Sequence, residues 1–198
     1  MRLKLITAPT EEPLTLSEVK EHIRVDVTDD DALITALIKA ARERAEFITR
    51  RQLVTATWQL IGDSFAAGGK GFNLPLPPLQ SVTKIEYVDT TGTLVTLSAM
   101  TYIVDNVSEP ARVALAPDII NWPETERGFN KVLVTFDAGY GAASAIPEDI
   151  KLAMKLLIGS WYANREAAVV AQGISATELP TIVSAEALLQ QFRVMRFS

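Results

Sequence analysis

The chain has 198 residues, of which 48% are apolar and 22% are charged, and this composition is ordinary for a folded globular protein. It has no cysteine and a single histidine, His22, which excludes disulfide bridges, thiolate metal sites, cysteine nucleophiles and multi-histidine metal sites. The formal net charge of -5 argues against general nucleic-acid binding, because neutralisation of phosphates dominates that affinity.

Two helices are predicted in the first 52 residues. Thr15 and Glu18 form a capping-box pattern, in which each side chain satisfies a free backbone N–H, so we expect a short helix over 16–22. An aspartate run at 29–31 opens a second helix that we expect to reach about residue 51, because apolar residues recur through it at helical spacing. Its acids lie near the start and its arginines towards the end, which complements the helix dipole.

Residues 53–140 are expected to form an antiparallel β-rich unit. Polar and apolar residues alternate from Leu53 onward, which is typical of a strand. Prolines at 75, 77 and 78 exclude a helix there, and the Thr-Thr-Gly-Thr sequence at 90–93 is typical of a hairpin turn. Strands are expected over 54–60, 82–88, 94–97, 102–104, 112–115 and 132–136.

Helix is predicted again from Pro147, a residue suited to the first helical position. The segment 150–162 is apolar on nearly all sides, which predicts a helix buried against several neighbours. Residues 167–183 have the composition of a linker, and a last helix is expected from about Ser184 to Arg193.

The predicted fold class is therefore α+β. A helical bundle core of residues 1–52 and 145–166 is expected to carry the β-rich unit of residues 53–140 as an insertion. Residues 167–198 are expected to form a loose C-terminal linker and docking segment that ends in the short helix. No apolar run approaches the ~20 residues that span a bilayer, so no membrane partner is expected.

No reaction centre is recognisable in the sequence. The aspartate run at 29–31 would suit a divalent cation, but a helix N-terminus is the commoner use of aspartate there. Gly139-Tyr140-Gly141 imitates a dinucleotide-binding loop without its third glycine, and a turn that leaves the β-rich unit explains it. His22 lacks the partners of a general base. We expect no catalytic residue, no metal site and no cofactor, and hence no enzyme.

Four arginines, at 42, 44, 50 and 51, lie towards the end of the second helix. They could contact DNA phosphates, but the acidic balance of the chain favours a solvated helix end with ion pairs to Glu43 and Glu46.

Apolar side chains at the C-terminus suggest a surface for another subunit, because such groups favour burial against a partner. The residues expected to dock on a partner are Leu188, Leu189, Phe192, Arg193, Val194 and Phe197.

Several short segments follow one another in an order and at a spacing that, taken together, are characteristic of one protein family. They are Leu14-Thr15-Leu16, Ile23-Arg24-Val25-Asp26 and Asp30-Asp31-Ala32-Leu33-Ile34, then Leu74 to Val82 with Tyr87, Asp89 and Gly92, then Phe136 to Gly141 and Ile146-Pro147 to Ile150, then Trp161 to Glu166 and Leu188-Leu189 with Phe192-Arg193. This pattern resembles the head–tail connector (adaptor) family of tailed bacteriophages, prophages and gene-transfer particles.

The resemblance implies a structural virion assembly protein. Such a protein would bind the portal as a ring, normally a dodecamer, and would extend the DNA channel towards a stopper or tail-completion protein. It would reside in the neck of the virion, after assembly in the host cytoplasm. The C-terminal docking residues would reach the portal or a neighbouring subunit, and DNA would pass without specific binding. The alternatives are a DNA-packaging accessory protein that binds DNA directly and a small metal-dependent enzyme that uses Asp29 to Asp31.

Overall fold

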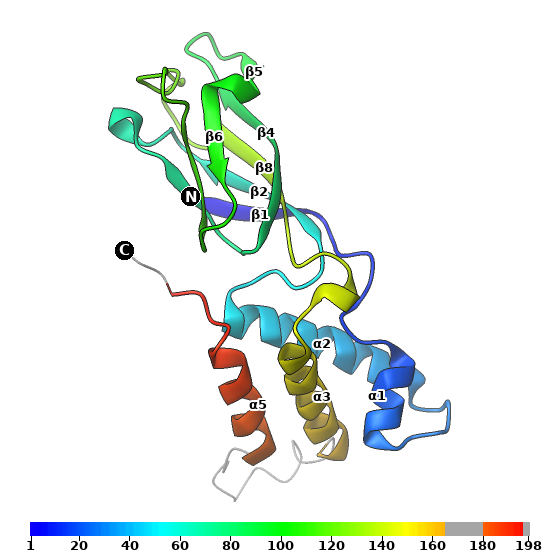
Figure 1. The fold of residues 1–198 in the computed structure, drawn as a ribbon. Helices are drawn as coiled ribbons and strands as arrows, with labels where there is room; N and C mark the ends of the chain where they lie inside the picture. The colour runs from blue at the N-terminus through cyan, green and yellow to red at the C-terminus, as the bar shows by residue number, and fades with distance from the viewer. Residues whose placement is uncertain (165–179, 196–198) are drawn as a thin grey trace, which may run out of the picture. The chain divides into compact units, whose positions relative to one another are not determined.

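The computed structural model describes residues 1–164 and 180–195 (Figure 1). The chain forms two compact units. One, the β unit, consists of Met1–Thr10 and Val54–Gly141, and the other, the helical unit, consists of Glu11–Leu53 and Ala142–Ser198. Because the helices and the antiparallel strands are segregated, the fold is α+β, and the predicted fold class is confirmed.

The β unit contains a five-stranded antiparallel sheet in the order β1-β2-β8-β4-β5. These strands are β1 (Arg2–Thr7), β2 (Ala56–Gly62), β8 (Val132–Ala138), β4 (Leu79–Val88) and β5 (Leu94–Thr96). The central strand β8 pairs with β2 through Phe136 opposite Trp58 and with β4 through Phe136 opposite Val82. Register along β4 shifts twice, so two bulges bend this strand across the sheet.

A second sheet has three antiparallel strands in the order β3-β7-β6, which are β3 (Phe72–Leu74), β7 (Ala111–Leu115) and β6 (Tyr102–Asp105). The two sheets share one apolar core. Phe136 and Ile85 of the large sheet and Val113 of the small sheet are fully buried members of it. The Phe65 ring stacks on Trp122, with ring centroids 4.8 Å apart, and closes one side of this core.

The structure corrects the sequence prediction at the N-terminus. Residues 1–52 were expected to belong wholly to the helical core, but β1 pairs with β2, with Leu3 opposite Leu60 and Leu5 opposite Trp58. Leu3 and Leu5 alternate with Arg2 and Lys4, which is the pattern of a short half-buried strand. The partner strand begins about 50 residues later, and nothing local in the sequence indicates that pairing.

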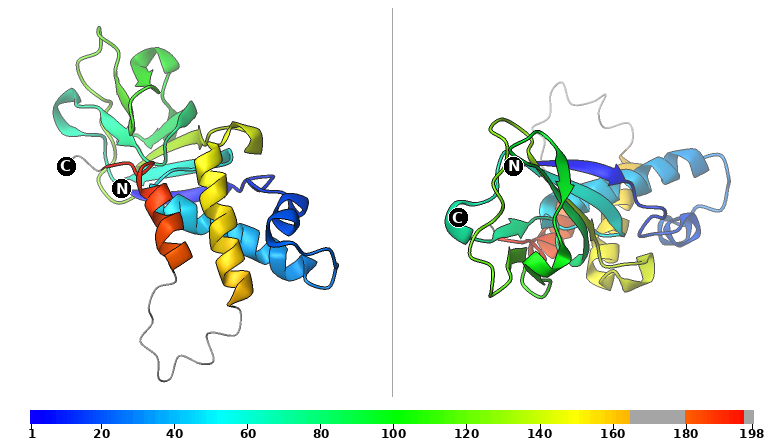
Figure 2. Two further views of the ribbon diagram at one scale, coloured as in Figure 1. Left: turned by 60° about the horizontal axis from the view of Figure 1, so that its bottom comes forward. Right: turned by 90° about the horizontal axis from the view of Figure 1, so that it is seen from above.

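The helical unit contains α1 (Leu16–Ile23), α2 (Asp31–Thr49), α3 (Glu148–Ala163) and α5 (Pro180–Gln190). Figure 2 shows α3 and α5 side by side, with α2 crossing both. The core of the helical unit is built from apolar residues at helical spacing, which are Ile34, Ile38, Ala41, Ala45, Ile150, Met154, Leu157, Ile158, Ala185 and Leu189. The prediction of a helix buried on several sides is confirmed for α3, which contacts α1, α2 and α5.

The residues next to the helix ends explain where α1 begins and where α2 ends. At the start of α1, the Thr15 hydroxyl accepts from the Glu18 N–H at 3.2 Å and the Glu18 carboxylate accepts from the Thr15 N–H at 2.8 Å, so the capping box is confirmed. The helix α2 ends at Thr49, two residues earlier than predicted, because Arg50 adopts a left-handed conformation with φ of 57°. The last helix runs over 180–190 instead of 184–193.

Candidate functional site

The helix α5 is packed into the helical unit. Leu189 is fully buried there and Leu188 is half-buried. The side chain of Leu189, which was expected to dock on a partner, therefore belongs to the core of its own unit. The sequence places Leu188, Leu189 and Phe192 at helical spacing but does not indicate which of them faces inward.

The segment after α5 is tied to the C-terminal end of α2. The Val194 N–H donates to the Thr49 carbonyl at 3.0 Å, and Arg51 Nε donates to the Phe192 carbonyl at 2.7 Å. Phe192 and Val194 are half-buried, while Arg193 is exposed and donates to Gln190 Oε1 at 3.3 Å. Phe197, the last of the predicted docking residues, lies outside the described residues.

Phe47 adds an aromatic surface at the same end of α2. It is 75% exposed, and the Arg44 guanidinium lies 5.9 Å from the centre of its ring. Arg44 also forms an ion pair with Glu186 of α5. Our sequence reasoning did not single out Phe47. Its position in the helical repeat could have identified it, because Phe47 falls outside the buried face of α2. The apolar residues of that face are Ile34, Ile38, Ala41, Ala45 and Ile48.

Arg42, which was weighed as a phosphate contact, is buried among carboxylates. Its Nε donates to Glu12 at 2.7 Å and its Nη1 donates to Glu46 at 2.9 Å, and Glu43 lies 4.0 Å away. The predicted ion pairs with Glu43 and Glu46 are therefore confirmed, but the expectation of a solvated helix end is wrong for Arg42, which is buried. The other Glu46 oxygen accepts from Gln52 Nε2 and from the Leu53 N–H. Burial raises the pKa of Glu46, and the neighbouring Arg42 opposes that rise. This network fixes the chain as it leaves α2.

The aspartates at 29–31 have different partners. Asp31 forms an ion pair with Lys20 at 2.6 Å, and Asp30 accepts a hydrogen bond from the Tyr162 hydroxyl at 2.5 Å, while Asp29 is exposed. Asp30 is the N-cap residue of α2, but its carboxylate bonds Tyr162 instead of a backbone N–H of the helix. Within residues 1–164 and 180–195, no group of three His, Asp or Glu side chains is placed to hold a metal ion.

The glycine motif at 139–141 is a structural turn. Gly139 has a φ of 127°, and a Cβ there would lie 2.8 Å from backbone atoms of Val54 and Thr55. The Thr55 N–H donates to the Gly141 carbonyl at 3.1 Å. Glycine is therefore required by the close approach of two backbone segments, in agreement with the interpretation as a turn. His22 is exposed on α1.

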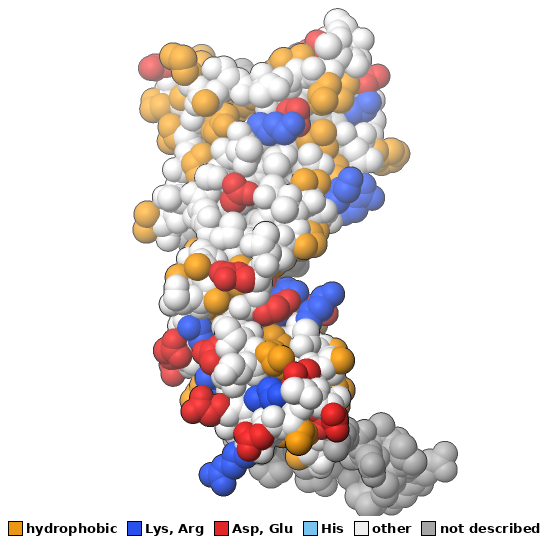
Figure 3. Space-filling view, turned by 90° about the vertical axis from the view of Figure 1, so that its right-hand side faces the viewer, with side chains coloured by type: hydrophobic (Ala, Val, Ile, Leu, Met, Phe, Trp, Pro, Cys, Tyr) orange, Lys and Arg blue, Asp and Glu red, His pale blue; other side chains and the backbone are white. Residues whose placement is uncertain are grey.

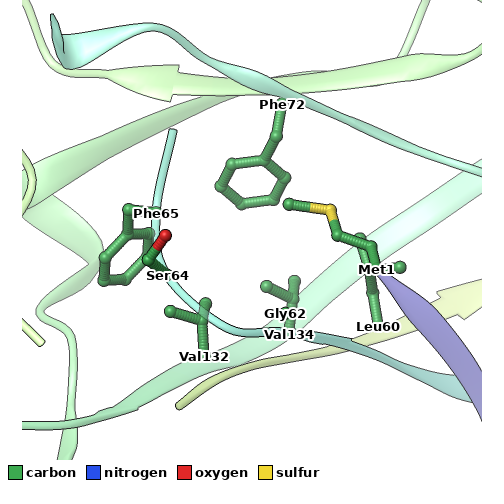
Figure 4. Close-up of a pocket in the computed structure, with 8 residues that line it drawn as sticks. All are labelled: Met1, Leu60, Gly62, Ser64, Phe65, Phe72, Val132 and Val134. Atoms are coloured by element: carbon green, nitrogen blue, oxygen red, sulfur yellow. The ribbon is translucent and has the colours of Figure 1, made fainter. Parts of the chain in front are cut away.

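A small pocket opens in the β unit (Figure 4). Its lining is apolar apart from Ser64, and it includes Met1, Phe65, Phe72 and Val132. Figure 4 shows the Met1 side chain reaching towards the Phe72 ring. No Asp, Glu, His or Lys side chain lines this pocket, so it places no general base beside the Ser64 hydroxyl.

The loops of the β unit carry the most exposed apolar side chains. Met100, Val107, Ile120 and Phe129 are each more than 80% exposed, at 87%, 87%, 83% and 82%. All four lie outside the regular strands. Exposed apolar groups of this size are typical of surfaces that contact another protein.

The described helices include none that is long and apolar enough to cross a membrane. Separately, the exposed side chains point to two surfaces as the strongest candidate sites: the end of α2 that carries the C-terminal segment, and the apolar loops of the β unit.

These features define a protein with interaction surfaces and no recognisable reaction centre among its described residues. Residues 12–193 match the family model "Head completion protein". The chain belongs to the head completion protein family, and the resemblance to head–tail connector proteins is confirmed.

Solved structures with the same fold come from gene transfer agent (GTA) particles. One chain from the neck of an empty GTA particle, computed with C6 symmetry, superimposes with a TM-score of 0.78 at 24% identity. A chain from the virion of a native GTA particle gives 0.77, and one from the neck of a native GTA particle, computed with C12 symmetry, gives 0.75, both at 24% identity. Each alignment covers 100% of this chain and 98% of the other. No curated protein matches the chain.

Proposed function

We propose that this protein is the adaptor of a head–tail junction, which binds a portal as a ring and extends the DNA channel towards the tail. Membership of the head completion protein family over 12–193 is the observation that carries the proposal. The fold similarity to chains from GTA necks computed with C6 and C12 symmetry supports a ring, and we propose twelve copies.

The partners of this ring would be neighbouring copies, the portal above and a stopper or tail-completion protein below. Its location would be the neck of the virion, after assembly in the host cytoplasm. DNA would pass through the channel without specific binding. The engagement of Arg42 by two carboxylates and of Arg44 by Glu186 supports this, because paired guanidinium groups are poorly available to phosphates. A role without catalysis is supported by membership of the head completion protein family.

We propose that the segment after α5 docks on the portal or a neighbouring subunit through Phe192, Arg193, Val194 and Phe197, together with Leu188. Arg193 is exposed, and Leu188, Phe192 and Val194 are half-buried and so keep part of their surface for a partner. Leu189 would act differently, by holding α5 in the helical core.

The test is deletion of residues 191–198 followed by assembly on purified portal. This deletion keeps α5 and the buried Leu189, so the unit should stay folded, as judged by circular dichroism. We expect the shortened chain to be lost from portal complexes in electron micrographs. A Thr181→Ala variant, altered at an exposed position of α5, is the matched control and should assemble normally.

Two results would count against the proposal. One is a folded, shortened chain that joins the portal as well as the full chain does. The other is tight binding of the full chain to DNA that weakens steeply with salt, which would favour the packaging accessory instead.

A further inference from the structure

One end of the helical unit is acidic. Residues 18–31, which include most of α1 and the loop before α2, hold six carboxylates and two cations, and we call them the acidic end. Glu21, Asp26 and Asp29 are exposed, and their side chains make no hydrogen bond or ion pair with the residues that the structure describes. Among them lies Val27, which is 59% exposed. Figure 3 shows several Asp and Glu side chains over the helical unit, with a few Lys and Arg side chains among them.

The other end is basic. Residues 44–51 hold three arginines and one acid, Glu46, which is paired with Arg42. Arg44 is paired with Glu186 of α5, so the excess positive charge comes from Arg50, Arg51 and Arg193. Arg193 lies at the same end, because the adjacent Val194 is bonded to Thr49. We call residues 44–51 and 191–195 the basic end. Arg50 is exposed and has no hydrogen-bond or ion-pair partner within residues 1–164 and 180–195.

Each end also has an exposed apolar centre, Val27 at the acidic end and Phe47 at the basic end, exposed by 59% and 75%. An exposed apolar group surrounded by charge is typical of the middle of a contact between proteins, where the apolar part is buried and the charges form the rim. The two ends are therefore complementary in charge and alike in layout.

The two ends lie at opposite ends of α2 (Figure 1). The acidic end precedes the first turn of α2 and the basic end covers its last turn, so about 28 Å separates them along a helix of 19 residues. Two different, complementary surfaces on one molecule give head-to-tail contacts between copies, which close into a ring when the rotation permits. A contact between two like ends would bring charges of the same sign together.

We propose that the acidic end of one copy docks on the basic end of the next, with Val27 packed near Phe47 and the carboxylates near the arginines. This inference rests on the proposed ring and names the contact that builds it. The occupant of each surface is thus a second copy of this chain. Charge complementarity of this kind steers association and fixes which surfaces meet.

The absence of cysteine makes the contact directly testable, because any introduced thiol is unique. The double variant Val27→Cys with Phe47→Cys is treated with a short bis-maleimide cross-linker in the full-length protein. We expect a ladder of dimers, trimers and larger species, since each copy then has one reactive site at each end. A mixture of the two single variants should stop at dimers that contain one of each. The wild-type chain is the blank.

The outcomes separate this contact from the proposed function. Either single variant that cross-links to itself as well as the mixture does would overturn the contact, because like ends would then meet. Rings or necks that contain the double variant but give no ladder would overturn the contact and leave the ring intact. If no ring or neck contains the chain, the proposed function fails and the contact fails with it.

A pair of glycine variants gives a second test that is matched in backbone chemistry. Arg50 and Arg24 both cap helices in the left-handed conformation, with φ of 57° and 58°, so glycine relieves the same strain at either position. We expect both Arg50→Gly and Arg24→Gly to melt no lower than the wild type. Arg50→Gly removes a cation from the basic end and should lower the yield of the cross-linked ladder. Arg24→Gly removes a cation from the acidic end and should not lower it. Equal loss in both variants would contradict the proposal.

Discussion

At the scale of single residues, Arg42 is a charged group that the fold buries. It is only 8% exposed, and it lies between Glu12 and Glu46. Burial alone would lower the pKa of this guanidinium, but the bonds to Glu12 and Glu46 outweigh it and raise the pKa, so the charge stays in place. Glu46 in turn accepts from the Leu53 N–H, which connects the ion pairs to the backbone at the exit of α2.

Replacing Arg42 with alanine should lower the free energy of unfolding by about 3 kcal/mol, because the largely buried Glu46 carboxylate would lose its counter-charge. Urea denaturation measures this loss. Arg44→Ala on the same helix is the control and should cost less than about 1 kcal/mol, since its ion pair with Glu186 is exposed. Equal losses in the two variants would show that Arg42 contributes no more than a surface charge.

The stability of the β unit should depend on pH through the carboxylate of Asp105. The Ser108 hydroxyl, the Arg112 guanidinium and the Ser108 N–H all donate to its carboxylate, and they hold its pKa well below its usual value of 3.8. A lowered folded pKa means that the ionised group stabilises the fold above the unfolded pKa, and that this contribution is lost as the pH falls through the folded pKa.

An Asp105→Asn variant should therefore melt below the wild type near neutral pH. The difference in melting temperature should shrink once the pH falls below about 3.8, the ordinary pKa of this carboxyl. Calorimetry over a pH series measures it. A difference that stays constant down to the acid limit would mean that the geometry of asparagine, and not the lost charge, causes the effect.

At the scale of elements, α5 is a part of the helical core. Leu189→Ala should lower the free energy of unfolding by roughly 2–5 kcal/mol, because it empties a fully buried site between helices. Leu188→Ala, one position along and only half-buried, should give a smaller loss in the same denaturation experiment. If the isolated protein tolerated Leu189→Ala without loss, this side chain would be free to serve a partner, as the sequence first suggested.

The helices could be predicted from the sequence because their causes are local. The capping box of Thr15 and Glu18 sets the start of α1, and the apolar repeat from Ile34 to Ile48 sets the buried face of α2. Pro147 was expected at the first helical position and lies one residue earlier, at the N-cap of α3, which begins at Glu148. Each of these signals acts within a few residues, so no knowledge of the rest of the fold is needed to recognise it.

The features that could not be predicted depend on distant partners. The strand β1 is six residues long and becomes a strand only by pairing with β2, so its own sequence does not assign it to the β unit. The inward direction of Leu189 depends on the placement of α5 against α2 and α3. Phe47 became a candidate only when the buried stripe of α2 showed which face was left exposed.

At the scale of the whole molecule, the net charge of -5 hides an uneven distribution. In the helical unit, Glu21, Asp26 and Asp29 precede α2 and have no bonding partner among residues 1–164 and 180–195, while Arg50 and Arg51 follow α2. The molecule can therefore be acidic overall and still offer a basic surface to another copy. The negative net charge would make free copies repel each other in most orientations. The opposite charges of the acidic and basic ends would still favour the one orientation in which these ends meet.

This arrangement predicts that the head-to-tail contact weakens with salt. The Debye length falls from about 10 Å at 0.1 M salt to about 3 Å at 1 M, so salt weakens the attraction between exposed charges on the two surfaces. The yield of the cross-linked ladder from the Val27→Cys, Phe47→Cys protein should thus fall as salt rises. An additional Asp26→Asn, Asp29→Asn change should lower the yield at low salt and flatten its dependence on salt. A yield that instead grows with salt would indicate a contact dominated by apolar burial, in which the opposite charges of the two ends have no part.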